Sequence, residues 1–169
     1  MKQFVISNCY KLSAAEVVEA ATNILATYHI FFCAADSSLS CGTQEDDIVL
    51  WPKEHFTLSA AESEANEWAA DTTSDVASDY SYLAEEYVSH DDYPDDDEWY
   101  DAVDEEMEQS LSCWIEPITD LDDICDAIDE LHGTIQAGAI GMDAAEIEYV
   151  RSIFYVLDEA RTALDEQED

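Results

Sequence analysis

A run of carboxylates is the feature of this sequence with the clearest capacity for chemistry. The segment HDDYPDDDEWYDAVDEEMEQ, residues 90–109, contains eleven Asp and Glu side chains and no Lys or Arg. Crowded carboxylates raise one another's pKa values and can act as general acids or bases. A catalytic site usually combines them with a nucleophile, a base or an oxyanion donor, and this segment offers none. We therefore expect no enzyme and assign no catalytic residues.

Metal binding is the second chemistry that carboxylates support. The pattern DDxxD occurs at residues 91–95 and 122–126 and resembles the magnesium motif of prenyl-diphosphate enzymes. With 22 Asp in 169 residues such matches arise from composition, and five Lys and Arg are too few to hold a diphosphate. The first match lacks the glycine of an EF-hand loop, and Cys113, Cys125 and His132 lack the paired spacing of a zinc site. The sequence predicts no metal site and no cofactor.

Net charge restricts the partners. Forty-two Asp and Glu against five Lys and Arg give a formal charge of −37. Residues 1–44 are close to neutral, residues 45–110 carry 23 acids against one base, and residues 111–169 carry 16 acids against two. Such a surface is repelled by phosphate and by anionic lipid, which excludes direct nucleic-acid binding and membrane binding. Because self-repulsion destabilises a compact chain, we infer that the charge is used, and that the partner is basic.

Targeting signals and cysteines indicate the compartment. The N-terminal MKQFVISNCYKL has too short an apolar run for a signal peptide, and no stretch approaches the roughly 18 apolar residues of a membrane span. Five cysteines, odd in number and irregularly spaced, favour reduced thiols over a disulfide framework. We expect a cytoplasmic protein, acting in the host cytoplasm if a phage encodes it.

Helical periodicity and capping sequences indicate the elements that position the carboxylates. Helices are expected over residues 13–28, from Ser59, from Thr73, over 94–113, over 119–132 and from Asp143. The short runs KQFVIS, IFFCA and DIVLW near the N-terminus are candidate strands. The expected fold is mainly α, possibly α+β: an acidic helical bundle with a small strand-containing N-terminal element. The expected domains are a near-neutral α/β element at 1–52 and a strongly acidic helical domain at 53–169.

The helix predicted after Pro94 separates its side chains into two faces. Trp99, Val103 and Met107 follow one another at i+4 steps and form the buried face, so the carboxylates are displayed on the other. The helix at 119–132 repeats this arrangement. The candidate partner-binding residues are Asp91, Asp92, Asp95, Asp96, Asp97, Glu98, Asp101, Asp104, Glu105, Glu108, Asp122, Asp123, Asp126 and Asp129.

The density of these charges is close to that of DNA. Nine carboxylates fall within residues 95–108, which at about 1.5 Å per helical residue gives roughly one charge per 2.3 Å. Duplex DNA carries about one charge per 1.7 Å along its axis with both strands counted. A rigid acidic helix can therefore imitate a phosphate backbone.

The acidic helices DDDEWYDAVDEEMEQ and DLDDICDAIDELH and the acidic end LDEQED resemble the DNA-mimic antirestriction proteins of phages and mobile elements. In character the chain is similar to the Ocr proteins, and in length and N-terminal pattern to the ArdA proteins. The resemblance implies an inhibitor that fills the basic groove of a DNA-binding protein, first of all a Type I restriction-modification enzyme, and a homodimer is compatible with it. Two alternatives stay open: an acidic chaperone for basic nucleic-acid-binding proteins, and a halophile-adapted structural protein.

Overall fold

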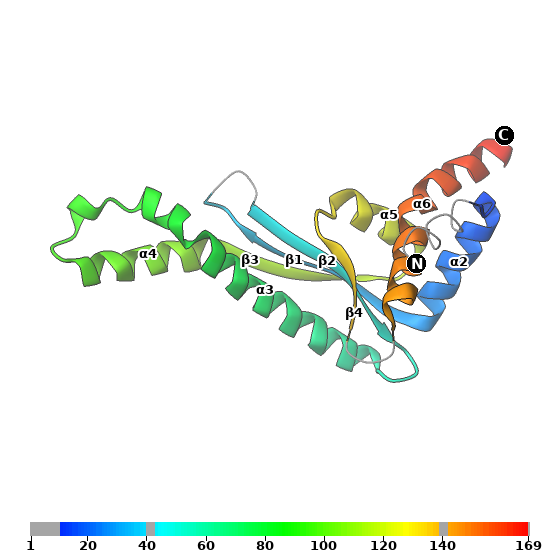
Figure 1. Ribbon diagram of the computed structural model, residues 1–169, viewed down its shortest axis with the longest axis horizontal. Helices are drawn as coiled ribbons and strands as arrows, with labels where there is room; N and C mark the ends of the chain where they lie inside the picture. The colour runs from blue at the N-terminus through cyan, green and yellow to red at the C-terminus, as the bar shows by residue number, and fades with distance from the viewer. Residues whose placement is uncertain (1–10, 40–42, 139–141, 169) are drawn as a thin grey trace.

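The computed structural model describes residues 11–39, 43–138 and 142–168, and it contains a four-stranded sheet with helices on both faces (Figure 1). The strand order is β3-β1-β2-β4, in which β1 pairs antiparallel with both β3 and β2, whereas β4 pairs parallel with β2. Within the described ranges, no helix combines the length and apolarity needed to cross a membrane.

The centre of the sheet is a hairpin of β1 (Tyr28–Ser37) and β2 (Thr43–Pro52). The candidate strands IFFCA and DIVLW lie within these elements, which confirms them, whereas KQFVIS lies outside the described residues. Both central strands are nearly continuously buried because helices cover both of their faces. Alternate side chains therefore enter two separate cores.

The larger core lies under α2 (Ala14–Thr27), α5 (Leu121–Glu130) and α6 (Ala144–Glu168). Even-numbered strand residues such as Phe32 and Leu50 point into it. In Figure 1 these three helices gather at the right of the sheet, where α2 and α6 pack against each other.

The opposite face is covered by α3 (Leu58–Tyr87), which runs without interruption for 30 residues. Small residues Ala61 and Ala65 allow it to pack closely on Phe31 and Trp51. The prediction of two helices, from Ser59 and from Thr73, is therefore wrong. Thr57 rather than Ser59 caps the single helix, because its side chain accepts the amide of Ala60 at 3.2 Å.

The expectation of a mainly α helical bundle is wrong, because the protein is an α+β structure. Two strands come from sequence that gave no strand signal: β3 (Leu111–Ile118), whose first residues were assigned to the helix at 94–113, and β4 (Thr134–Ala137). Both are edge strands that obtain their backbone hydrogen bonds from the central hairpin, so tertiary pairing rather than local pattern defines them. The sheet consequently crosses the predicted domain division at residue 52.

Side-chain caps fix the ends of the remaining helices. Ser13 and Glu16 form a capping box at the start of α2, within the helix predicted over residues 13–28. Asp95 caps α4 (Asp96–Ser110), so Pro94 lies just before the helix rather than in its first turn. Asp120 caps α5, whereas Thr119, the first residue of the helix predicted over 119–132, lies before the cap and donates its hydroxyl to Asp123.

Candidate functional site

The most acidic part of the chain forms a projecting helical hairpin. The second half of α3 turns through the short 3₁₀ helix η1 (His90–Asp92) into α4, and Figure 1 shows this pair extending beyond the sheet at the left of the view. We refer to residues 77–110 as the arm. Its sequence contains fourteen Asp and Glu and no Lys or Arg, and the surrounding chain has neither cation between Lys53 and Arg151.

A small apolar cluster holds the arm together. Ala84 from α3 packs with Val103 and Met107 from α4. At the turn, the indole nitrogen of Trp99 donates to the carbonyl of Val88 at 3.0 Å, and the Trp99 ring lies 4.9 Å from that of His90. The predicted apolar face of this helix is thus confirmed as the buried one. Because it faces α3, the carboxylates are left on the outer surface.

Ten of the predicted partner-binding residues belong to the arm, and all ten are exposed. Three of them also have structural contacts: Asp95 accepts the amide of Glu98 at 3.0 Å as the helix cap, and Asp96 lies 3.1 Å from a ring nitrogen of His90. The carboxylate of Glu105 accepts a hydrogen bond from the side-chain amide of Gln109 at 3.0 Å. Among the described residues, the carboxylates of the other seven form no hydrogen bond or ion pair: Asp91, Asp92, Asp97, Glu98, Asp101, Asp104 and Glu108.

The four predicted residues on α5 lie elsewhere. Helix α5 covers the sheet face opposite α3, so the structure separates these acids from the arm (Figure 1). Asp122 forms an ion pair with Arg161. Asp123 accepts the amide of Thr119 at 2.8 Å, and this hydrogen bond lowers the pKa of its carboxyl group. Asp126 and Asp129 are exposed. The structure therefore brings ten of the fourteen residues together and leaves α5 as a second, smaller acidic surface.

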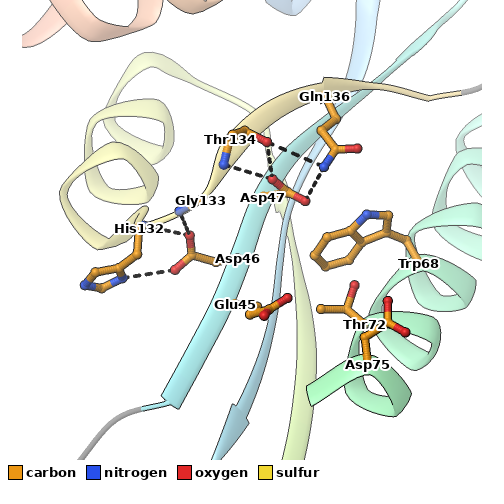
Figure 2. A pocket seen from close by; sticks show the side chains of 10 residues that line it. All are labelled: Glu45, Asp46, Asp47, Trp68, Thr72, Asp75, His132, Gly133, Thr134 and Gln136. Carbon is orange, nitrogen blue, oxygen red and sulfur yellow. Dashed lines mark hydrogen bonds and ion pairs between the residues drawn. The ribbon is translucent and has the colours of Figure 1, made fainter. Parts of the chain in front are cut away.

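An acidic cavity of about 480 Å³, which the sequence did not predict, lies between β2, β4 and α3 (Figure 2). Its lining combines four carboxylates with an indole ring, hydroxyl groups, an amide and an imidazole. The lining residues are Glu45, Asp46, Asp47, Trp68, Thr72, Asp75, His132, Gly133, Thr134 and Gln136. The only sequence signal is the run EDD, residues 45–47, placed directly before the apolar strand residues IVLW.

Asp46 ties the loop before β4 to the central hairpin. Its buried carboxylate accepts the amides of His132 at 2.6 Å and Gly133 at 2.7 Å, and it lies 3.1 Å from Nδ1 of His132. Position 133 requires glycine because a Cβ there would lie 1.7 Å from the backbone oxygen of Asp46. The helix predicted over residues 119–132 ends at Glu130, and Gly133 lies where the loop before β4 passes close to β2.

Asp47, the next residue, also connects β2 to β4 through hydrogen bonds. It accepts the amide of Thr134 at 2.9 Å, the Thr134 hydroxyl at 2.8 Å and the Gln136 amide at 2.7 Å. Burial raises the pKa of Asp47 above its ordinary value of 3.8, although the Thr134 hydrogen bonds oppose this shift. On the neighbouring strand, burial and the charge of Asp47 raise the pKa of Cys33 to about 12, so this thiol is unreactive.

The shifted pKa of Asp47 makes a pH-dependent contribution to stability. Because the folded state holds this proton more tightly than the unfolded state, the contribution falls as pH rises above 3.8 through the folded pKa. Asp47→Asn removes the titration. We expect the free energy of unfolding of the native protein, measured relative to the variant by urea denaturation, to decline with rising pH over this interval. Two parallel curves would contradict the prediction.

The cavity is suited to cations rather than anions. Asp46 and Asp47 are already hydrogen-bonded, whereas the carboxylates of Glu45 and Asp75 line the same cavity as the ring of Trp68 (Figure 2). Carboxylates and an indole face together favour ammonium or guanidinium groups. Among the described residues, no group of three or more His, Cys, Asp and Glu is arranged to hold a metal ion.

The chain matches no protein-family model, no curated protein and no solved structure. The resemblance to the antirestriction proteins therefore stays a prediction that depends on charge, helicity and the geometry of the arm.

Proposed function

We propose that this protein is a DNA mimic that inhibits a DNA-binding enzyme by occupying its basic groove. The observation that supports this proposal is the arm, a projecting helical hairpin with ten exposed candidate carboxylates and no Lys or Arg. A flat acidic patch would attract cations, but it would not match the shape of a DNA-binding groove. A narrow rod of carboxylates has the outline of the ligand that a DNA-binding groove accepts.

The spacing on α4 suits this role. Asp97, Asp101, Asp104 and Glu108 follow one another at steps of four, three and four residues, which places them along one side of the helix. Neighbouring Cβ atoms at such steps are about 5–6 Å apart, close to the separation of adjacent phosphates on one strand. Lysine and arginine side chains arranged to contact a DNA strand can therefore contact this row.

The arm is also held in its shape before it meets a partner. Its apolar cluster and the Trp99 to Val88 hydrogen bond hold α4 against α3. A preformed surface loses little conformational entropy on binding, which favours affinity. Its unneutralised charge accelerates encounter with a positive groove, and the complex is expected to weaken steeply as salt rises.

The inhibitor acts by competition and needs no chemistry of its own. A Type I restriction-modification enzyme in the host cytoplasm is the first target to test, since its DNA groove is long and positively charged. Other defence nucleases and DNA-repair enzymes present the same type of groove. Exclusion of duplex from that groove is the inhibitory step.

A competitive pull-down tests the proposal. The tagged protein is incubated with bacterial lysate, washed in a salt gradient and challenged with duplex DNA, and released proteins are identified by mass spectrometry. We expect one dominant DNA-binding enzyme that the duplex displaces, because both ligands occupy one groove. A broad set of ribosomal and nucleoid proteins leaving at low salt would contradict mimicry and favour an acidic chaperone. Capture of no protein would favour halophilic adaptation.

A further inference from the structure

Strand β3 forms one edge of the sheet, because among the described residues β1 lies on one side of it and no strand lies on the other. It is eight residues long, whereas β4 at the opposite edge has four. An edge strand of this length presents a row of backbone groups that can pair with another strand.

The direction of these backbone groups follows from the register. The amide of Ser38 donates to the carbonyl of Ser110 at 3.0 Å, which makes this pair a hydrogen-bonded one in the β1–β3 ladder. Hydrogen-bonded pairs recur at every second residue, so even-numbered residues of β3 bond to β1. Leu111, Cys113 and Ile115 therefore direct their amides and carbonyls away from the sheet. Pro117, which has no amide hydrogen, occupies the next outward position, as expected for an edge.

Natural proteins usually protect long edges with lysines, prolines, bulges or a covering element. Residues 111–115 contain neither lysine nor proline. Among the described elements, only β1 and α3 contact β3 extensively, and α3 packs on its face through Ile115. Cys113 is exposed. Within the part of the chain that the structure describes, the first five residues of this edge thus have no pairing partner on their outer side.

Charge favours a second copy of this chain as the occupant. Residues 109–119 contain a single acid, Glu116, although the flanking helices α4 and α5 are densely acidic. Two copies that each carry −37 can approach closely only where their surfaces are nearly neutral, and this edge meets that condition. The same strand on both copies also offers matching donors and acceptors about a two-fold axis.

We propose that two copies pair antiparallel through their β3 edges and form one continuous sheet. Pairing centred on Cys113 places Leu111 of one copy opposite Ile115 of the other, and it uses only outward residues that carry an amide hydrogen. The two Cys113 Cα atoms then lie about 5.5 Å apart, within the range of about 4.4–6.8 Å that a disulfide spans.

This pairing determines how the arms are displayed. Helix α4 leads directly into β3, and the arm extends past the end of the sheet at which β3 begins (Figure 1). A two-fold axis across β3 makes the two arms project in opposite directions. The dimer is then an elongated acidic body, which keeps the like charges far apart. The pairing itself does not depend on the proposed DNA mimicry.

The test measures oligomeric state and Cys113 proximity together. Cys9 and Cys41, which lie outside the described residues, are replaced by Ser, while Cys33 and Cys125 are buried. Light scattering and sedimentation should give a dimer across the micromolar range that strengthens with salt, because salt screens the repulsion between copies. Mild oxidation should link the copies through Cys113. A monomer at every concentration and salt, or a dimer without this crosslink, would overturn the proposal.

Matched variants test whether the dimer interface is formed by the backbone groups of the β3 edge. Cys113→Pro removes one outward amide without removing a bond to β1 and should give monomers, whereas Cys113→Ser keeps the amide and should stay dimeric. If the proline variant does not fold, Cys113→Lys, which places two cations opposite each other, should dissociate the dimer at low salt. A dimer unaffected by both Pro and Lys would contradict edge pairing. Target binding falls with salt while dimerisation rises, so failure of one proposal is distinguishable from failure of the other.

Discussion

Replacing Asp97, Asp101, Asp104 and Glu108 by lysine is expected to weaken target binding by roughly 10³-fold. Each substitution removes an attraction to the positive groove and adds a repulsion of similar size, and the four effects fall on one contiguous row of α4. The helix itself should persist, because all four side chains are exposed and none belongs to the apolar cluster. Displacement of fluorescent duplex from a Type I restriction-modification enzyme measures the loss, and circular dichroism checks the fold.

A control variant distinguishes recognition of the arm from attraction to the total charge of the protein. Glu19, Glu54, Glu62 and Glu67 are exposed residues outside the arm, and their replacement by lysine produces the same net charge. We expect this variant to lose far less affinity than the arm variant. Equal losses would show that the bulk field rather than the arm is recognised. Asp126→Lys with Asp129→Lys tests separately whether the α5 surface contributes.

Asp46→Ala is expected to destabilise the protein by about 2–4 kcal/mol, a large part of the stability of an ordinary domain. The truncation leaves the amides of His132 and Gly133 without their acceptor at the point where β4 joins β2. A buried donor that loses its acceptor costs about 1–3 kcal/mol. Urea denaturation monitored by tryptophan fluorescence measures the free energy of unfolding.

Two further variants identify the cause of this loss. Asp46→Asn retains an oxygen that can accept both amides, so it should cost about 1 kcal/mol. Glu45→Ala, at the adjacent and more exposed position, should change stability little. If Asp46→Ala unfolded at the same urea concentration as the native protein, the hydrogen bonds between Asp46 and the loop before β4 would not stabilise the fold, and the prediction would be wrong.

The exposed acidic helix was predictable because its information is local. Trp99, Val103 and Met107 recur at helical spacing, so the carboxylates between them must lie on the opposite face whatever the rest of the fold does. The capping box at Ser13 is likewise local, because it depends only on Ser13 and on Glu16 three residues later. Burial of the strands IFFCA and DIVLW follows from their apolar runs.

The acidic cavity and the edge strands were not predictable in this way. Asp46 and Asp47 lie in a chain with 22 Asp, and what distinguishes them from surface acids is the approach of a distant segment. His132 and Gly133 bond to Asp46, and Thr134, 87 residues after Asp47, bonds to Asp47. Strand β3 has no alternation of exposed and buried residues, since it obtains its form by pairing with β1. The single helix α3 was divided in two because its polar middle lacks periodicity, although the sheet beneath supports it.

The sequence by itself determined the sign and density of the charge and the exposure of the carboxylates on α4, because helical periodicity and composition do not depend on distant contacts. Only the tertiary structure decided that the acids of α5 lie apart from those of the arm, that two aspartates are buried, and that β3 lies at the edge of the described sheet. These three properties depend on which segments pair across the sheet, and pairing partners far apart in the chain leave no periodic signal in the sequence.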